Sequence, residues 1–480
     1  MKFSNKAMLI TYPDSLGGNL KELDNNLQTK FYKSIGGIHL LPFFPSSGDR
    51  GFAPERYDVV DGKFGDWNDI RKLSNDFYLM FDFMINHLSK KSPEFQDFLK
   101  KGYNSKFSNM FINWNRFWPS GRPNSNDIDL IYKRKDKAPV QEITLHDGRK
   151  TLLWNTFGSE QIDLNIDSSE VKKMLINVLK IFSENGASIV RLDAFAYAIK
   201  KIDSNDFFVE PDIWKLLGWI NRIATKDQLM ILPEIHENYK LVDKVSDHGY
   251  FTYDFALPML VLNAIYSRKS TKLLNWIKSR PMKQFTTLDT HDGIGVVDVK
   301  GILSDKEIRT TVDELYKRGS NVKRIYSSAE YNNLDIYQIN TTYYSALGEN
   351  DAAYLLSRVI QVFSPGIPQI YYVGLLAGSN DLKLLESTKE GRNINRHFYT
   401  SNEISKEIKR PVVIKLLHLL EFRNSCEAFD LFGYIDFEQE DEKHFSIIRS
   451  NKEKSEVAKI VVDLNDYSFE LFNNNKIVKL

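Results

Sequence analysis

Eight short apolar runs recur along the chain, and helical patterns or longer polar segments separate them. The runs are 6–12, 36–44, 78–87, 187–195, 229–237, 249–258, 284–292 and 366–374. Branched and aromatic residues in runs of this length are typical of strands buried on both faces of a sheet. Strands that alternate with helices form parallel sheets. Eight such units predict an α/β fold built on a closed (β/α)8 barrel, a TIM barrel.

The clearest helical pattern lies just before the fourth run. Apolar residues repeat at helical spacing from Val171 to Phe182. Ser168 or Ser169 suits the N-cap of such a helix, and Gly186 suits its C-terminal stop. We therefore expect a helix that leads directly into the fourth strand.

Three segments depart from the alternation of strands and helices. Residues 88–160, rich in Asn, Lys, Trp and Pro, predict an inserted subdomain after the third strand, and 293–355 predict a second one after the seventh. Residues 435–480 show short alternating strands without a long helix, which predicts a C-terminal β domain. The barrel itself is predicted to comprise 1–87, 161–292 and 356–434.

Charge and cysteine content limit the classes of partner. The 64 Lys and Arg residues balance 63 Asp and Glu residues, so we expect neither nucleic acid nor an anionic membrane as partner. The single cysteine, Cys426, excludes an intramolecular disulfide framework and a multi-cysteine metal cluster. No apolar run has the length of a signal peptide's central region or of a membrane span. These features favour a cytoplasmic protein with small-molecule substrates.

Charged residues interrupt the predicted strands at their carboxyl ends. In IVRLDAFAY, Arg191 and Asp193 would cost several kcal/mol if they were buried without partners. Polar residues at this end of barrel strands line the active site. Four strand ends carry them: Asp82, Asn86 and His87; Arg191 and Asp193; Glu234 and His236; His291 and Asp292. One Arg–Asp pair alone is at least as often structural, but three carboxylates on three strand ends predict catalysis, with Asp82 and Arg191 in support.

Other chemistries lack their motifs. The chain has no GxxxxGK[ST] phosphate loop and no GxGxxG fingerprint, and His236-Glu237 lacks the second histidine of a zinc-protease helix. We expect no cofactor and no metal. The aromatic clusters Tyr78–Met84 and Trp114–Trp118 are typical of a core, and the basic run 133–137 is typical of a solvated face.

Paired carboxylates suit glycoside chemistry. That reaction uses one ionised carboxylate below the anomeric carbon and one protonated acid beside the leaving oxygen. Arg191 would favour the ionised form of Asp193, while an enclosed pocket and nearby carboxylates would raise the pKa of Glu234. In a retaining enzyme the two carboxyl groups lie about 5–5.5 Å apart, which we expect for Asp193 and Glu234.

Four motifs resemble those of the α-amylase superfamily, in the same order: DFMINH, VRLDA, the Glu of LPEIHE, and TLDTHD. More specifically, LLPFFPSSGDRGF, LDTHDGIGVVD, NNLDIYQINTTYYSALG and GRNINRH resemble the sucrose phosphorylases of that superfamily. The likeness covers nearly the whole chain. It implies transfer of glucose from sucrose to inorganic phosphate with net retention, giving fructose and α-D-glucose 1-phosphate.

The resemblance also implies roles for individual residues. Asp193 would be the nucleophile, Glu234 the general acid/base and Asp292 the stabiliser of the distorted glucosyl ring. The glucose pocket would comprise Asp49, His87, Phe157, Gln161, Arg191, Tyr197, His291 and Arg392. The acceptor side, where fructose leaves and phosphate enters, would comprise Arg134, His236, Asp335, Tyr337 and Gln338.

Three alternatives stay open. The first is a phosphorylase for a related glucoside, such as sucrose 6′-phosphate or glucosylglycerol, although the charge of Asp335 opposes a phosphorylated substrate. The second is a retaining α-glucosidase that uses water as acceptor. The third is a binding or transporter-associated protein without activity, against which the intact Asp193, Glu234 and Asp292 argue.

Overall fold

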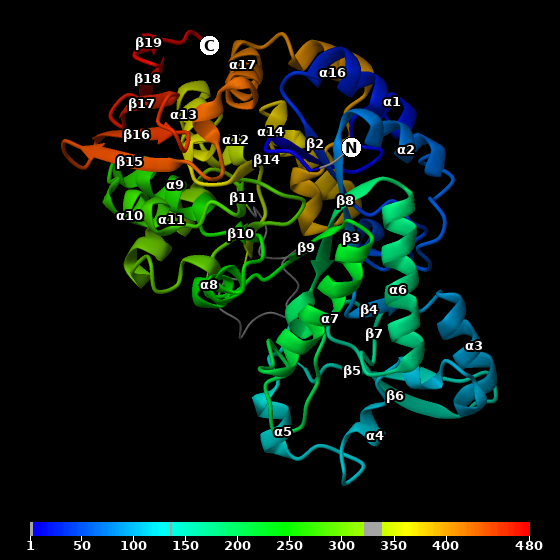
Figure 1. Ribbon diagram of the computed structural model, residues 1–480. Helices are drawn as coiled ribbons and strands as arrows, with labels where there is room; N and C mark the ends of the chain where they lie inside the picture. The colour runs from blue at the N-terminus through cyan, green and yellow to red at the C-terminus, as the bar shows by residue number, and fades with distance from the viewer. Residues whose placement is uncertain (1–2, 135–136, 321–337) are drawn as a thin grey trace. The chain divides into compact units, whose positions relative to one another are not determined.

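The computed structural model describes residues 3–134, 137–320 and 338–480 (Figure 1). Within these residues the chain forms two compact units. The first unit is Leu40–Ile235. The second unit comprises 3–39, 236–320 and 338–480. The predicted Asp335 and Tyr337 lie outside the described residues.

Each of the eight apolar runs contains a strand of one sheet. The strands are β1 Met8–Thr11, β2 Gly37–Leu40, β3 Tyr78–Met84, β8 Ala187–Asp193, β9 Met230–Pro233, β10 Thr252–Asp254, β11 Gln284–Thr287 and β14 Ile367–Tyr371. Their order in the sheet is β10-β11-β14-β1-β2-β3-β8-β9, which is the chain order started at a different strand. This is the order of a (β/α)8 barrel, so the predicted fold class is confirmed.

In the first unit, β3 pairs in parallel with β8, and β8 pairs in parallel with β9. All of β3 is buried, which confirms Tyr78–Met84 as core. The helices that precede these strands are α2 Trp67–Asp76, α6 Ser169–Glu184 and α7 Asp212–Lys226. The predicted helix is thus present with Ser168 as N-cap residue, although the Ser168 side chain makes no capping hydrogen bond. Gly186 follows at a φ of +89°, where a Cβ would lie 2.4 Å from Ser74 Cβ.

The segment between β3 and β8 folds around its own aromatic core. Its elements are β4 His87–Ser89, α3 Pro93–Lys101, α4 Trp114–Phe117, α5 Ser125–Leu130, β5 Val140–Thr144, β6 Lys150–Trp154 and β7 Gln161–Asp163. Trp114, Trp118 and Trp154 are buried together in one cluster, so the tryptophans are core residues, as predicted. β4 pairs antiparallel with β7. The predicted subdomain boundaries at 88–160 and 293–355 stay a prediction.

In the second unit, β10, β11, β14 and β1 pair in parallel in that order. Its helices are α1 Leu20–Asn26, α8 Tyr239–Asp247, α9 Leu257–Ser267, α10 Thr271–Ser279, α11 Asp305–Lys317, α12 Tyr343–Ala346, α13 Asp351–Phe363, α14 Tyr372–Leu375, α15 Leu382–Thr388, α16 Ser401–Glu407 and α17 Pro411–Ser425. After β11, β12 Ile294–Gly295 pairs antiparallel with β13 Gln338–Ile339. Among the described residues, none of the helices has the length and apolarity to cross a membrane.

The chain ends in an antiparallel sheet, shown in orange to red in Figure 1. Its strands are β15 Tyr434–Gln439, β16 His444–Ser450, β17 Val457–Asp463, β18 Ser468–Asn473 and β19 Lys476–Ile477, paired in chain order. Arg449 in β16 is fully buried and donates to the carbonyl oxygens of Phe363 and Ser364, at the end of α13. The predicted C-terminal β domain is confirmed.

Candidate active site

The charged residues of β8 have partners on both neighbouring strands. The register pairs Arg191 with Asp82 on β3 and with Leu232 on β9, so its side chain reaches carboxylates from three strands. Arg191 Nη1 lies 2.6 Å from Asp82 Oδ1 and 3.0 Å from Asp193 Oδ1, and Nη2 lies 3.1 Å from Glu234 Oε1. We call these four residues the Arg191 group. The guanidinium compensates the charges that interrupt the strand, which is why the strand tolerates them.

Burial in the Arg191 group decreases toward the two predicted catalytic carboxylates. The side chains of Asp82 and Arg191 are 0% and 3% exposed, whereas those of Asp193 and Glu234 are 15% and 11% exposed. The backbone N–H of Ala194 donates to Glu234 Oε2 at 2.9 Å. Ala194 follows β8 with a φ of +52°, and this turn brings its N–H to the carboxyl group. Arg191, which is itself paired with Asp82, thus holds both carboxyl groups, and Asp193 and Glu234 are the more exposed members of the group.

His87 is the first residue of β4 and has both polar and aromatic neighbours. The carbonyl oxygen of Phe52 accepts a hydrogen bond from His87 Nε2 at 2.9 Å and another from Gln161 Nε2 at 2.9 Å. Burial lowers the pKa of His87, although the Phe52 carbonyl and nearby carboxylates oppose that shift. His87 is therefore neutral at pH 7, with its proton on Nε2. The structure brings together His87 and Gln161, as the sequence predicts.

Aromatic rings extend the surroundings of His87. The ring centroid of Phe157 lies 5.6 Å from that of His87 and 5.1 Å from that of Tyr197. Tyr132 and Phe207 stack at 4.5 Å, and Phe207 meets Tyr197 edge to face at 4.9 Å. The sequence reasoning identified Phe157 and Tyr197 but missed Tyr132 and Phe207, which have no motif around them.

Asp49 lies in a short turn with an uncommon backbone conformation. Asp49 and Arg50 have φ values of +45° and +47°, and Gly51 follows at +108°. A Cβ at Gly51 would lie 2.6 Å from Pro42 Cβ, so this close approach requires glycine. Asp49 is exposed. Its negative charge acts to raise the pKa of His87, because the two side chains are close enough to interact electrostatically.

Arg134 follows α5 and is half-buried. It lies directly before residues 135–136, which are outside the described part of the chain. Its predicted role toward phosphate stays a prediction.

In the second unit, Asp292 lies after β11 beside an arginine and a histidine. Asp292 Oδ1 lies 3.0 Å from Arg392 Nη1, and Oδ2 lies 3.6 Å from His291 Nε2. We call these three residues the Asp292 group. Burial opposes ionisation of Asp292, but Arg392, His291 and His236 outweigh it and hold its pKa well below its usual range. Asp292 is therefore a carboxylate at neutral pH.

The 3-10 helix Gly391–Asn395 and the residue after it hold the loop that carries Asp292. Asn395 Nδ2 donates to the Asp292 carbonyl oxygen at 3.1 Å, and Arg396 donates twice to the His291 carbonyl oxygen, at 3.0 and 2.9 Å. The sequence reasoning selected Arg392 from the motif GRNINRH but missed Asn395 and Arg396. The motif itself was the signal for all three residues.

His236 packs against Phe255 and faces Asp298. The two rings stack with centroids 3.7 Å apart, and His236 Nδ1 lies 3.6 Å from Asp298 Oδ2. A Cβ at Gly295 would lie 1.9 Å from Asp298 Oδ2, so the glycine makes room for this carboxylate. Phe255 and Asp298 were not predicted. Gln338 pairs with Gly295 across β12 and β13, which places this predicted acceptor residue on the strand beside that of Gly295.

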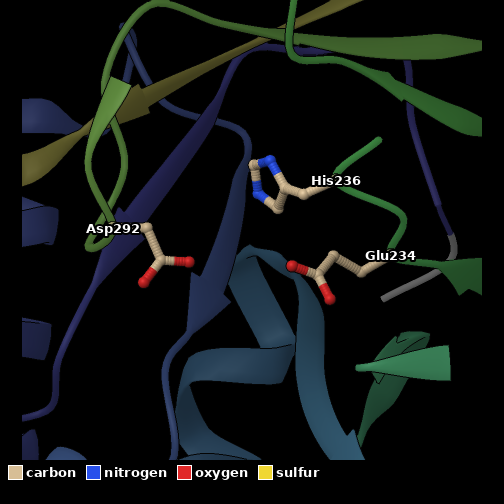
Figure 2. A group of neighbouring side chains, drawn as sticks. All are labelled: Glu234, His236 and Asp292. Carbon is tan, nitrogen blue, oxygen red and sulfur yellow. The ribbon is translucent and has the colours of Figure 1, made fainter. Parts of the chain in front are cut away.

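Figure 2 shows three of the predicted residues as sticks. Glu234 and His236 come from the segment after β9, and Asp292 comes from the segment after β11. Carboxylates and a histidine are residue types that bind divalent cations. The same residue types perform acid–base and electrostatic chemistry on sugars without a metal.

Comparison with known proteins decides the family. The α-amylase catalytic-domain model matches residues 17–411. The chain belongs to the α-amylase family. It is 57% identical to the sucrose phosphorylase of Streptococcus mutans over 478 residues, covering 100% of this chain and 99% of the relative. It is 43% identical to the sucrose 6(F)-phosphate phosphorylase of Thermoanaerobacterium thermosaccharolyticum, covering 99% of this chain and 98% of the relative.

Solved structures agree with this assignment. The crystal structure of sucrose 6F-phosphate phosphorylase from Thermoanaerobacter thermosaccharolyticum matches with a TM-score of 0.94 and 42% identity, covering 100% of this chain and 98% of that one. An α-amylase from H. orenii matches with a TM-score of 0.67 and 16% identity, covering 96% and 90%, which shows the shared fold. The resemblance to sucrose phosphorylases, and with it the prediction of a glycosyl-transferring enzyme, is confirmed.

Proposed function

We propose that this protein transfers glucose from sucrose to inorganic phosphate and releases D-fructose and α-D-glucose 1-phosphate. The Arg191 group carries the proposal, because one buried guanidinium holds both carboxyl groups that a retaining transfer needs. The 57% identity to a sucrose phosphorylase supports sucrose and phosphate as the substrates. The single cysteine favours a reducing compartment, so we propose a cytoplasmic enzyme.

The first half-reaction forms a bond between glucose and Asp193. The Asp193 carboxylate attacks the anomeric carbon on the face opposite to fructose, while Glu234 gives its proton to the leaving oxygen. The glycosidic bond breaks with inversion. The Arg191 guanidinium keeps Asp193 turned toward the sugar, since its own position is fixed by Asp82. Asp292 stabilises the positive charge that develops on the glucosyl ring.

The second half-reaction moves glucose to phosphate. A phosphate oxygen attacks the anomeric carbon, the ester bond to Asp193 breaks, and Glu234 accepts a proton when the attacking oxygen is a hydroxyl. This second inversion restores the α configuration. The two carboxyl groups supply the acid and the nucleophile, so the proposed reaction uses no metal ion and no cofactor.

The other predicted residues belong to two parts of the site, one that binds glucose and one that binds the acceptor. We assign the glucose contacts to Asp49, His87, Phe157, Gln161, Arg191, Tyr197, His291 and Arg392. We assign the acceptor side to Arg134, His236, Asp335, Tyr337 and Gln338. Arg134, His236 and the Tyr337 hydroxyl are the proposed phosphate donors, because a dianion that enters a site lined with carboxylates needs donors that water does not.

Product analysis tests the proposal. The protein is incubated with sucrose, with and without phosphate, and the sugars are identified by NMR. We expect fructose and α-D-glucose 1-phosphate with phosphate, and only slow splitting of sucrose without it. Free glucose released at equal rates in both reactions would instead identify an α-glucosidase, and no reaction at all would identify a binding protein.

A second candidate is phosphorolysis of a related glucoside. The structural match at TM-score 0.94 to a sucrose 6F-phosphate phosphorylase favours including it, as does 40% identity to the glucosylglycerol phosphorylase of Marinobacter adhaerens. Sucrose 6′-phosphate and glucosylglycerol are therefore tested beside sucrose. We expect the highest kcat/KM for sucrose, and a higher value for either other glucoside would replace sucrose in the proposal.

A further inference from the structure

The first unit contains a buried lysine ammonium group near the residues proposed to contact glucose. The Lys200 side chain is 2% exposed, and its Nζ lies 2.8 Å from Oδ2 of Asp163, which is 0% exposed. Nζ also donates to Asn86 Oδ1 at 2.9 Å and to the carbonyl oxygen of Tyr197. An ammonium group has three N–H donors, and all three have acceptors here.

Asp163 also accepts several hydrogen bonds besides its contact with Lys200. Its Oδ1 accepts from the Thr156 N–H at 2.8 Å, and its Oδ2 accepts from Thr156 Oγ1 at 2.6 Å and from Asn86 Nδ2 at 3.2 Å. Burial opposes ionisation of Asp163, but the Lys200 charge and the Thr156 donors outweigh it and lower its pKa. Lys200 and Asp163 therefore form a charged pair inside the unit.

The partners of this pair adjoin the residues expected to contact glucose. Asn86 precedes His87, Thr156 precedes Phe157, and the third contact is the carbonyl oxygen of Tyr197 itself. Asp163 is also the register partner of His87 across β4 and β7. The ring of Phe157 packs against the rings of both His87 and Tyr197. Three segments that are distant in sequence thus meet both at the ion pair and at the rings.

We propose that Lys200 is a positioning residue for the glucose site. Its ammonium ion, together with Asp163, fixes the three backbone segments that carry His87, Phe157 and Tyr197. Lys200 contacts none of the reacting atoms and acts only through these segments. This inference rests on the proposed function, since that assigns the three rings to glucose.

A buried ion pair between two loop-borne segments, here the one that ends β7 and the one that follows β8, has a purely structural explanation as well. Removing one partner of such a pair destabilises a protein because it leaves the other charge unpaired. A lower stability of a Lys200 variant would therefore not distinguish positioning from structural support. The experiment must restore charge balance without restoring the contacts of the ammonium ion.

The experiment compares Lys200→Met with the double variant Lys200→Met/Asp163→Asn. The double variant removes both charges of the Lys200–Asp163 pair and also lacks the three donors of Lys200. Lys201→Met is the matched control. Lys201 is the next residue in the chain, but it is 56% exposed and pairs with Asp212 at 2.8 Å on the surface. For each protein, calorimetry gives the dissociation constant of D-glucose and a thermal scan gives the unfolding midpoint.

We expect Lys200→Met to raise the glucose dissociation constant about 10- to 100-fold, since a shift of about 1 Å in binding groups has effects of that order. The double variant should recover most of the lost unfolding midpoint but keep the raised dissociation constant, and Lys201→Met should match the parent. A parental dissociation constant in Lys200→Met, or its recovery together with the midpoint in the double variant, would overturn the inference. If Lys200→Met does not fold, the double variant decides alone.

Failure of the proposed function gives a different result. If the parent protein forms no glucose 1-phosphate from sucrose, the proposed reaction is wrong whatever the variants do. If the parent forms it, and the double variant binds glucose as the parent does, only the role of Lys200 is wrong.

Discussion

Two arginines contact predicted catalytic carboxylates, one in each unit, and their surroundings differ. Arg191 is 3% exposed and contacts Asp82, Asp193 and Glu234. Arg392 is 37% exposed and contacts Asp292. The nearly buried Arg191 guanidinium has three carboxylate partners, so most of its hydrogen-bonding capacity orients those partners. The more exposed Arg392 has more of its surface available to a ligand, so we expect Arg191 to matter more for the stability of the site than Arg392 does.

The largest expected effect tests whether the Arg191 group contains the nucleophile. Asp193→Asn keeps the shape of the side chain but removes the attacking carboxylate, so kcat should fall by several orders of magnitude. Sucrose phosphorolysis is measured beside a circular dichroism spectrum, which should match the parent. A folded Asp193→Asn protein with activity near that of the parent would place the nucleophile elsewhere.

The next effect compares the two arginines directly. Arg191→Met leaves buried Asp82 without its cation and should lower the free energy of unfolding by about 3–5 kcal/mol. Arg392→Met removes a cation that is 37% exposed and leaves His291 beside Asp292, so it should lower the free energy of unfolding by less than Arg191→Met does. Both variants should lose activity. Urea unfolding of the two variants beside the parent measures the difference, and equal losses of stability would contradict the distinction between them.

A third arginine, Arg134, is proposed to act on the acceptor side. If it donates to phosphate, Arg134→Ala removes one hydrogen bond to a charged ligand, worth about 1.5–3 kcal/mol, so the phosphate concentration for half-maximal rate should rise roughly 10- to 150-fold. Water has no charge to anchor, so hydrolysis should take a larger share of the sucrose consumed at fixed phosphate. The share is obtained from the ratio of glucose to glucose 1-phosphate. An unchanged share with both rates lowered would make Arg134 a structural support.

The smallest expected effect concerns protonation. Burial keeps His87 neutral in the first unit, whereas nearby arginine and histidine side chains keep Asp292 ionised in the second. Because the folded pKa of His87 is lowered, its contribution to stability is complete above the unfolded pKa of about 6.5 and is lost as the pH falls through the folded pKa. The slope is at most about 1.4 kcal/mol per pH unit for this group.

Urea unfolding of the parent and of His87→Asn, each above and below that unfolded pKa, measures this contribution. The parent should lose more stability than the variant as the pH falls. Equal losses in the two proteins would show that His87 does not carry the effect.

The periodic parts of the fold were predictable from the sequence. Each apolar run contains a barrel strand, and α6 begins and ends within one residue of its predicted limits, because burial of repeated apolar positions determines both. The predicted strands were too long at their carboxyl ends. The run 284–292, for example, contains β11 only over Gln284–Thr287. The residues after each strand have the composition of a strand, but they leave the sheet and form the site.

The site was predictable where a short motif carries its chemistry. Arg191, Asp193 and Glu234 lie at the ends of adjacent strands, so their contacts follow from the order of the sheet. Lys200 and Asp298 were not predicted, since their partners Asp163 and His236 are distant in sequence and no periodicity relates them. Contacts of that kind depend on how the loops after the strands fold.

Trapping the glucosyl intermediate tests whether Asp193 and Glu234 have separate roles as nucleophile and acid. Glu234→Gln is mixed with α-D-glucosyl fluoride without phosphate, because fluoride leaves without an acid and water attacks slowly without a base. Mass spectrometry after denaturation and digestion should find one glucosyl residue on the peptide that contains Asp193. Phosphate added before denaturation should remove this residue as α-D-glucose 1-phosphate. No adduct, or an adduct on a peptide without Asp193, would contradict the account.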